Sequence, residues 1–199
     1  MKNLAYLLLL TISLYSCQNS FQSKKIYRVT VDGVFDLPHW GHQNVIHNAR
    51  ETAAKFFMTS KDNIFVIVGV AGTPKELTSY KRPSVYTQQE KIRQLSGFKG
   101  VDLVVRKEMK TTKEFMEKYK IDLVVTGSDY NDPKKREKWY SYPYSIGKFK
   151  TFGRTQGVST SDIMRKTSRS IAVVVKRNKL TDKEKEAVQI YEGLVERYF

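Results

Sequence analysis

Apolar residues along the chain follow two alternating patterns, one typical of buried strands and the other of helices. Nearly continuous apolar runs predict strands that a parallel sheet covers on both faces. These runs span residues 64–70, 101–105, 121–126 and 171–175, and a β-branched run predicts a further strand at 26–31. Apolar residues three and four apart predict helices at 41–57 and 181–198, while capping residues predict helices at 87–95, 112–119 and 159–167. Because strands alternate with helices, the pattern indicates an α/β domain built on a parallel sheet.

Two stretches carry neither pattern. Residues 69–85 contain Gly72, Pro74 and Pro83 and predict a loop. Residues 127–153 are aromatic and basic, and we expect irregular structure there. Interleaved basic and aromatic side chains would suit single-stranded nucleic acid. We favour packing, together with contact to a phosphate group, as the interpretation of this stretch.

The first 23 residues differ from the rest of the chain. Lys2 is the only charged residue among them, and the apolar run 4–15 is shorter than the roughly 20 residues that span a membrane. Such a run fits the hydrophobic part of a secretory signal, and residues 14–17 resemble a lipoprotein cleavage box that ends at Cys17. We therefore expect a signal peptide or membrane-targeting segment over 1–23. It predicts a location in the secretory pathway or at a membrane, with the cytoplasm as the alternative.

The rest of the chain is predicted to form one domain with a C-terminal extension. The domain covers 24–170, which is an ordinary domain length. A strand and an amphipathic helix follow over 171–199, and we expect them to pack on the domain or on a second copy in a dimer.

Charge and rare residue types narrow the function. The chain has 35 Lys and Arg against 20 Asp and Glu among its 199 residues, a formal net charge of +15. This surplus favours a partner rich in phosphate: a nucleotide, a nucleic acid or an anionic membrane. A single Cys excludes a disulfide framework and a cysteine-based zinc site, and three His leave little for a histidine-built metal site.

The segment after the first predicted strand holds the first candidate site. Parallel sheets bind ligands at the carboxyl ends of their strands, so residues 32–42 should lie there. Gly33 permits a backbone turn close to a ligand, and His39 and His42 fall at the start of a helix. The free N–H groups and the dipole of a helix start attract phosphate. Two imidazoles would add hydrogen-bond donors for charge that develops on phosphorus.

A second anion site is predicted at residues 154–162. Arg154 precedes a glycine and several hydroxyl residues that cap the next predicted helix. Such a cap presents N–H and hydroxyl donors to an anion, while Arg154 supplies a fork for phosphate oxygens. Both segments would face the same edge of a parallel sheet. Together they predict a site for a ligand that carries several phosphates.

These segments resemble the signatures of the cytidylyltransferase family, which makes CDP-linked alcohols. Residues 32–42 match its Gly-x-Phe-Asp and His-x-Gly-His motifs. Residues 154–160 match its Arg-Thr-x-Gly-Ile-Ser-Thr motif, with Val158 in place of Ile. The resemblance covers about 26–166 and implies a Rossmann-like, doubly wound parallel sheet over the predicted domain.

The resemblance also implies substrates and partners. A phosphate oxygen of a small phosphoalcohol would attack the α-phosphorus of CTP and release pyrophosphate, with Mg²⁺ bound to the triphosphate. The domain 24–170 would be the catalytic domain, and no nucleic acid would be a partner. Segments 88–91 and 101–105 are similar to the helix and strand that help form the family's dimer, so we expect a homodimer. Membrane association through the N-terminus is a further expectation.

The family implies a role for each matching residue. The catalytic residues would be His39, His42, Lys81 and Arg154, with Lys81 at the position of a phosphate-binding lysine. Asp32 and Tyr140 would bind the phosphoalcohol, and no residue would hold a metal ion directly. The nucleotide would be bound by Gly33, Phe35, Asp36, Gly127, Asp129, Thr155, Gly157, Val158, Ser159 and Thr160.

The identity of the phosphoalcohol stays open. The motif at 154–160 resembles the phosphoethanolamine enzymes most, whose CDP-alcohol would serve phospholipid synthesis. Glycerol-3-phosphate is an alternative that suits the basic stretch 134–154. Phosphocholine is another, but Met109 and Asn131 stand where aromatic residues of a cationic cage are expected. A catalytically inactive nucleotide-binding relative and a nucleic-acid-binding protein remain as further alternatives.

Overall fold

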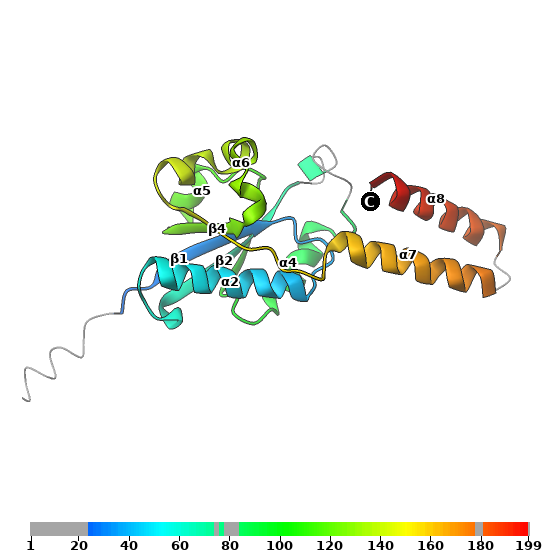
Figure 1. Ribbon diagram of the computed structural model, residues 1–199, viewed down its shortest axis with the longest axis horizontal. Coiled ribbons are helices and arrows are strands. Elements are labelled where there is room, and N and C mark those ends of the chain that lie inside the picture. The colour runs from blue at the N-terminus through cyan, green and yellow to red at the C-terminus, as the bar shows by residue number, and fades with distance from the viewer. Residues whose placement is uncertain (1–23, 74–75, 78–83, 178–180, 199) are drawn as a thin grey trace, which may run out of the picture.

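Five parallel strands form one sheet in the order β3-β2-β1-β4-β5 (Figure 1). The computed structural model describes residues 24–73, 76–77, 84–177 and 181–198. The strands are β1 Tyr27–Gly33, β2 Ile64–Ala71, β3 Leu103–Lys107, β4 Leu123–Gly127 and β5 Phe149–Phe152. The strand order reverses between β1 and β4, which makes the sheet doubly wound. The predicted α/β class and Rossmann-like sheet are confirmed.

Helices cover both faces of the sheet. They are α2 Trp40–Phe56, α4 Gln88–Ser96, α5 Lys113–Lys118, α6 Pro133–Ser145, α7 Thr160–Arg177 and α8 Asp182–Tyr198, with short 3-10 helices η1 Lys61–Asn63 and η2 Ser128–Asn131. Ile46 of α2 and Leu95 of α4 pack on one face. Met116 of α5 and Tyr140 of α6 pack on the other face.

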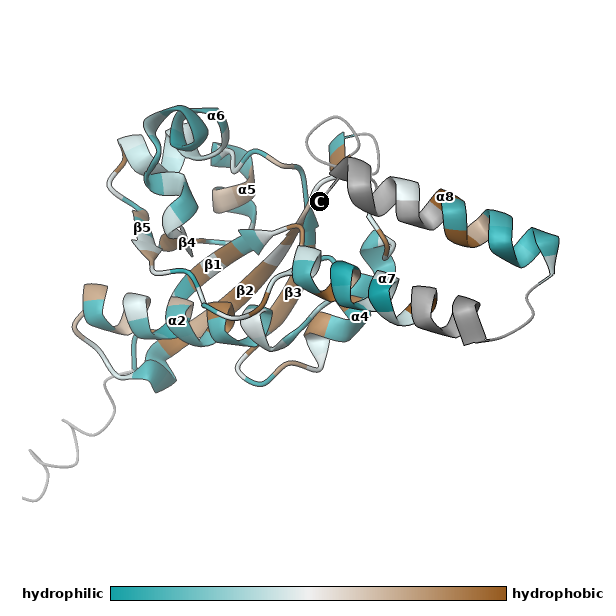
Figure 2. Cartoon of the chain, turned by 45° about the vertical axis from the view of Figure 1, so that its right-hand side comes forward, coloured by the Kyte–Doolittle hydropathy of each residue, from teal (hydrophilic) through white to brown (hydrophobic). Residues whose placement is uncertain are grey.

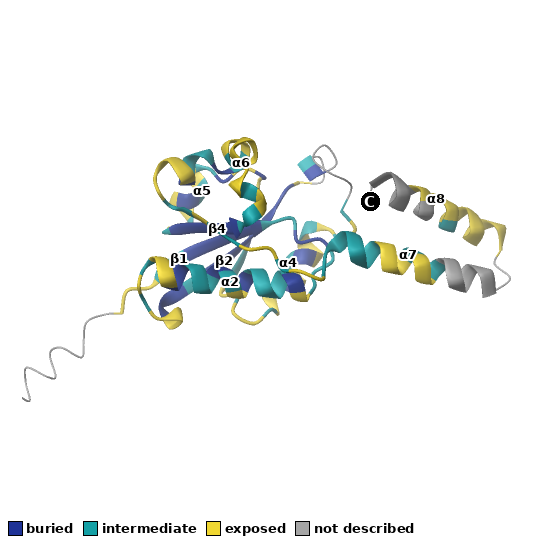
Figure 3. Ribbon diagram, in the orientation of Figure 1, coloured by how far each residue is buried: buried dark blue, intermediate teal, exposed yellow. Residues whose placement is uncertain are grey.

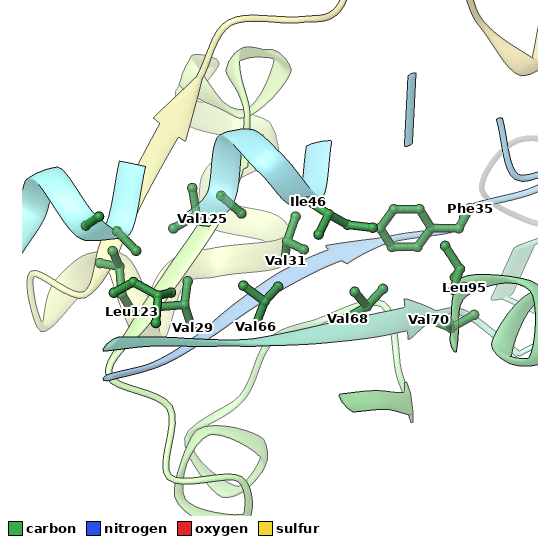
Figure 4. Packing of buried hydrophobic residues seen from close by; sticks show 14 residues of the cluster. Val29, Val31, Phe35, Ile46, Val66, Val68, Val70, Leu95, Leu123 and Val125 are labelled. Carbon is green, nitrogen blue, oxygen red and sulfur yellow. The ribbon is translucent and has the colours of Figure 1, made fainter. Parts of the chain in front are cut away.

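β2 has no polar face because it lies between two apolar cores. On β2, Val66 and Val68 belong to the core under α2, while Ile67 belongs to the core under α5 and α6. All three are fully buried, which explains the unbroken apolar run in the sequence. Figure 4 shows Val31 and Val66 packed beneath Ile46 of α2. Burial is concentrated in the central strands (Figure 3), which are also the most hydrophobic elements (Figure 2).

One arginine of α2 fixes the amino end of the sheet. Arg50 donates a hydrogen bond to the carboxylate of Asp102 (2.7 Å), which also accepts from the backbone N–H of Val66 (2.7 Å). Its guanidinium donates further to the carbonyl oxygens of Lys61, Ile64 and Gly100. Arg50 thereby ties α2 to the starts of β2 and β3, and the opposite ends of these strands lie near the site.

The C-terminal region corrects the predicted strand at 171–175. These residues lie inside α7, which continues to Arg177 instead of ending near residue 167. Residues 161–177 contain neither Gly nor Pro, so nothing in the sequence interrupts the helix after its start. The predicted last helix is present as α8, which packs against α7. Both helices extend away from the sheet (Figure 1).

The prediction of irregular structure over residues 127–153 is wrong, because these residues are regular. They form η2, α6 and β5. The carboxylate of Asp132 accepts hydrogen bonds from the backbone N–H groups of Lys134 and Lys135, and Pro133 occupies the first turn of α6. The helix was not recognised because Tyr140 interrupts it with non-helical dihedral angles, so its apolar positions lack a constant spacing.

The predicted signal segment 1–23 lies outside the described residues and stays a prediction. Among the helices that the structure describes, none combines the length and hydrophobicity needed to cross a membrane.

Candidate active site

A cavity of about 610 Å³ opens at the carboxyl ends of β1 and β4, where the strand order reverses. Ligands bind at this position in doubly wound sheets, and the volume is typical of small-molecule sites. Thirteen of the predicted site residues line it: Asp32, Gly33, Phe35, Asp36, His39, His42, Gly127, Asp129, Arg154, Thr155, Val158, Ser159 and Thr160. The fold therefore brings the two predicted anion segments to one site.

His39 and His42 are held by the backbone at the start of α2. The Nδ1 atom of His39 accepts a hydrogen bond from the N–H of Gly41 (3.1 Å), and the Nδ1 atom of His42 accepts one from the N–H of His39 (3.3 Å). The two rings stack with centroids 3.8 Å apart. Because each Nδ1 atom is an acceptor, a neutral ring carries its proton on Nε2. Each histidine can therefore offer one N–H donor to a ligand in the cavity.

Burial keeps both histidines neutral. It lowers the pKa of His42 to about 3, with a further lowering from His39 that the carboxylate of Asp36 partly opposes. Burial also lowers the pKa of His39. Removing an imidazole from water disfavours its charged form, so the rings act as neutral donors at physiological pH. Positive charge for a polyphosphate must come from other side chains.

The turn between β1 and α2 is held by contacts with two other segments. Phe35 has a left-handed backbone (φ +49°), and its ring lies edge-on to His42 with centroids 5.2 Å apart. The carboxylate of Asp36 accepts hydrogen bonds from the backbone N–H groups of Val85 (3.1 Å) and Tyr86 (3.0 Å). The carbonyl oxygen of Asp36 accepts one from the hydroxyl of Thr160 (2.9 Å). Asp36 therefore positions the turn against the start of α7.

The starts of α2 and α7 are in direct contact. A side chain added at Gly41 would lie 2.6 Å from Val158 Cγ1, so only glycine permits this approach. Ser159 caps α7: its hydroxyl accepts from the N–H of Asp162 (3.1 Å) and donates to the Asp162 carboxylate (2.6 Å). Two helix N-termini thus border one cavity, and both favour negative charge.

The far side of the cavity is lined by residues after β4 and β5. Gly127 ends β4, and Asp129 lies in η2. A guanidinium nitrogen of Arg154 is 3.9 Å from the Asp129 carboxylate, and both side chains are 61% exposed. Arg154 is therefore a solvent-accessible cation at the rim of the cavity. Lys135 of α6 also lines the cavity and adds a second cation.

Three predicted residues do not line the described cavity. Lys81 lies outside the described residues, so its role stays a prediction. Gly157 is left-handed (φ +82°), as a turn before α7 requires, but is not part of the lining. Tyr140 is only 3% exposed and packs against Tyr130 and Phe149. The structure therefore does not place the Tyr140 ring where a small alcohol would bind.

Sequence reasoning missed other lining residues. Ser84, Tyr130, Lys135 and Phe152 border the cavity. The hydroxyl of Ser84 is buried and has no hydrogen-bond partner among the described residues. Tyr130 of η2 and Lys135 of α6 belong to the aromatic and basic stretch already noted, and a correct assignment of these two elements would have identified them.

The described residues contain no group of three or more His, Cys, Asp or Glu side chains placed to hold a metal ion. The carboxylate of Asp36 already accepts hydrogen bonds from two backbone N–H groups, and the carboxylate of Asp129 lies beside the guanidinium of Arg154. The donor set therefore fits an ion that enters with a polyphosphate better than one resident in the protein.

Comparison with known proteins agrees with this geometry. The sequence profile of the cytidylyltransferase-like family matches residues 30–166. The chain is 33% identical to the ethanolamine-phosphate cytidylyltransferase of Mus musculus, over 71% of this chain and 32% of that protein. It is 35% identical to choline-phosphate cytidylyltransferase 2 of Arabidopsis thaliana, over 80% of this chain and 51% of that protein. The matched segment thus spans about a third to a half of these relatives.

A solved structure shares the fold. The lipopolysaccharide core biosynthesis protein from Thermoplasma volcanium GSS1 matches with a TM-score of 0.50 at 17% identity, over 66% of this chain and 99% of that chain. The profile match covers both anion segments and the strands between them. This chain therefore belongs to the cytidylyltransferase-like family.

Proposed function

We propose that the protein transfers CMP from CTP to a small phosphoalcohol, giving a CDP-alcohol and pyrophosphate. One observation carries this proposal: two helix N-termini and two neutral histidine donors border the same cavity. Such an arrangement suits several phosphate groups held side by side. Membership of the family and the two cytidylyltransferase relatives support it.

In the proposed reaction, one P–O bond forms and another breaks. A phosphate oxygen of the acceptor attacks the α-phosphorus of CTP, and the bond from that phosphorus to the oxygen bridging the β-phosphate is lost. The Nε2–H groups of His39 and His42 would donate to phosphate oxygens as negative charge grows on them. Arg154 and the start of α7 would hold the departing pyrophosphate. Mg²⁺ would enter with CTP and offset the charge of the triphosphate.

Three further expectations belong to the same proposal. Lys81 would contact a phosphate group, although it lies outside the described residues. A homodimer would form through segments 88–91 and 101–105, which light scattering of the purified protein would test. Targeting by residues 1–23, which would bring the enzyme to a membrane, is tested by fractionating cells that produce the full chain.

The acceptor is a separate question. The motif at 154–160 favours phosphoethanolamine, which would give a CDP-alcohol for phospholipid synthesis. Phosphocholine is supported by the second relative. Glycerol-3-phosphate is a further candidate because the basic stretch 134–154, whose Lys135 lines the cavity, suits an anionic acceptor.

The reaction is tested by following pyrophosphate release from Mg–CTP with each of the three acceptors. We expect His42→Ala to lower the rate by about 100-fold or more, because a donor to developing charge is lost. His47→Ala is the matched control, since His47 is an exposed histidine on the same helix. Equal rates in the two variants would contradict the role of His42. Tight CTP binding without turnover of any acceptor would indicate an inactive relative instead.

A further inference from the structure

The charged side chains of the cavity limit which acceptor it can hold. Within the described residues, three aspartates and two basic residues line it: Asp32, Asp36, Asp129, Lys135 and Arg154. The histidines are neutral and add no charge. An acceptor with an ammonium group would need a carboxylate as its partner. Whether any of the three aspartates is available therefore decides the acceptor class.

Two of the aspartates are already engaged. Both oxygens of the Asp36 carboxylate accept backbone hydrogen bonds, from Val85 and Tyr86. Asp129 lies beside the guanidinium of Arg154, at 3.9 Å. An ammonium group at Asp129 would have to approach this guanidinium, and like charges repel.

Asp32 is enclosed more completely than either. Its Oδ1 atom accepts a hydrogen bond from the hydroxyl of Thr30 (2.7 Å), and its Oδ2 atom accepts one from the hydroxyl of Thr111 (2.7 Å). The ammonium of Lys107 lies 3.4 Å from Oδ2. The side chains of Asp32 and Lys107 are each 1% exposed. The chain therefore neutralises this carboxylate with a cation of its own.

Lys107 is fixed in this position by the loop that follows β3. Its ammonium donates to the carbonyl oxygens of Glu108 (2.7 Å) and Met109 (3.2 Å). With Asp32, these acceptors match the three donors that a lysine ammonium possesses. The pair is a satisfied buried ion pair, and a ligand cation could reach Asp32 only by displacing Lys107.

The sheet is built to contain this pair. Asp32 is the last residue but one of β1, and Lys107 ends β3. On β2, which lies between these two strands, Gly69 pairs with Asp32 and Ala71 pairs with Lys107. A side chain at Gly69 would lie 2.4 Å from the Asp32 carboxylate and 2.6 Å from the Lys107 stem. The glycine leaves the space through which the two charges meet across a strand.

We infer that the acceptor carries no ammonium group and is the phosphate ester of an uncharged polyol. Lys107 takes the place beside Asp32 that an amino alcohol would need, while Lys135 remains for the acceptor's phosphate. Lys107 is thus a positioning residue that sets specificity by occupying a carboxylate. This inference rests on the proposed cytidylyl transfer, and it replaces phosphoethanolamine as the expected acceptor.

The test compares two small phosphate esters, glycerol-3-phosphate and phosphoethanolamine. The first carries hydroxyl groups where the second carries an ammonium group. With the full chain and Mg–CTP, we measure the binding of each by calorimetry and the kcat/KM of pyrophosphate release. We expect glycerol-3-phosphate to be favoured by about tenfold or more in both, because each carboxylate of the described site already has a protein partner.

The two measurements separate the inference from the proposed function. If neither compound is turned over, the proposed transfer fails, and binding alone still decides the inference. Phosphoethanolamine that binds as tightly as glycerol-3-phosphate would overturn the inference, whichever compound is turned over. Failure of both to bind would overturn it as well.

A variant tests the role of Lys107 directly. Lys107→Met keeps the stem and removes the ammonium, so the ratio of the two kcat/KM values should shift about tenfold toward phosphoethanolamine as Asp32 becomes available. Lys110→Met is the control, since Lys110 is an exposed lysine in the same loop. An unchanged ratio in a folded Lys107→Met protein would contradict the assignment. If this variant does not fold, the comparison of acceptors with the unaltered chain decides.

Discussion

The two histidines of the site show how backbone hydrogen bonds can determine the chemistry of a side chain. His39 and His42 are stacked and partly buried, and each uses Nδ1 as an acceptor for a backbone N–H. The protein thereby sets the tautomer of both rings. A neutral donor keeps its proton over the whole physiological pH range. Phosphate binding by these rings therefore does not depend on a pKa close to physiological pH.

This burial predicts how stability depends on pH. Burial lowers the pKa of His42 from 6.5, the ordinary value of a histidine, to about 3 in the folded protein. The unfolded chain therefore binds a proton that the folded chain does not, and stability falls as pH drops below 6.5. Between about pH 7.5 and about pH 5.5, the free energy of unfolding should decrease by about 1.4 kcal/mol from His42.

Urea unfolding at several pH values measures this decrease. His42→Gln should flatten the profile in that range, while His47→Gln on the exposed face of α2 should keep the slope of the unaltered protein. A His42→Gln profile as steep as that of the control would show that another group causes the pH dependence.

At the residue scale, local motifs were predictable and contacts across the sheet were not. His39, His42 and Arg154 could be identified because each motif is a short segment at a helix start. The partner of Asp32 could not, because Lys107 is distant in the sequence and meets Asp32 only through the register of β1, β2 and β3. The family resemblance implies a binding role for Tyr140, yet its ring packs in the core under α5 and α6.

At the scale of elements, α2 connects the site to the opposite end of the sheet. Its start holds the histidines, and Arg50 in its fourth turn donates to Asp102 and to three backbone carbonyl groups. Arg50→Lys keeps the charge but loses the planar fork that reaches several acceptors. We expect it to destabilise the protein by about 1–2 kcal/mol, because the partly buried carbonyl group of Ile64 and two exposed carbonyl groups lose their donor.

Chemical denaturation measures this loss. Arg93→Lys is the matched control, since Arg93 is an exposed arginine on α4. A loss in Arg50→Lys no larger than in Arg93→Lys would show that the hydrogen bonds of Arg50 add little to stability.

The elements themselves were predicted unevenly, for physical reasons. β2 and β4 are covered on both faces, so burial imposes an apolar run that the sequence displays. β5 is an edge strand of four residues, too short to show a pattern. The β-branched run at 171–175 favours a strand locally, but it continues a helix that began at Thr160, and the surrounding chain overrides its propensity.

At the scale of the whole molecule, the net charge of +15 should draw polyphosphates to the cavity. Charges beyond the site are screened by salt, over a distance of about 10 Å at 0.1 M and about 3 Å at 1 M ionic strength. The association rate of CTP should therefore fall by about tenfold across this range. Stopped-flow measurement of CTP binding tests this expectation.

Cytidine is the control ligand, because it keeps the base and sugar of CTP and lacks the phosphates. Its association rate should change little with salt. An equal salt dependence for cytidine and CTP would mean that the charge of the protein does not guide the triphosphate.

The buried pair of Asp32 and Lys107 also restricts the order in which substitutions can accumulate. Losing either partner alone leaves an uncompensated charge in the interior, which costs about 3–5 kcal/mol. Any larger residue at Gly69 would collide with both. The three positions should therefore change together across related sequences. A sequence in which only some of them have changed should be less stable than one in which none or all have changed. A lineage that lost the lysine and kept the aspartate would remain stable only if its substrate supplied the missing cation, so a change of acceptor and a change of residue would arise as one event.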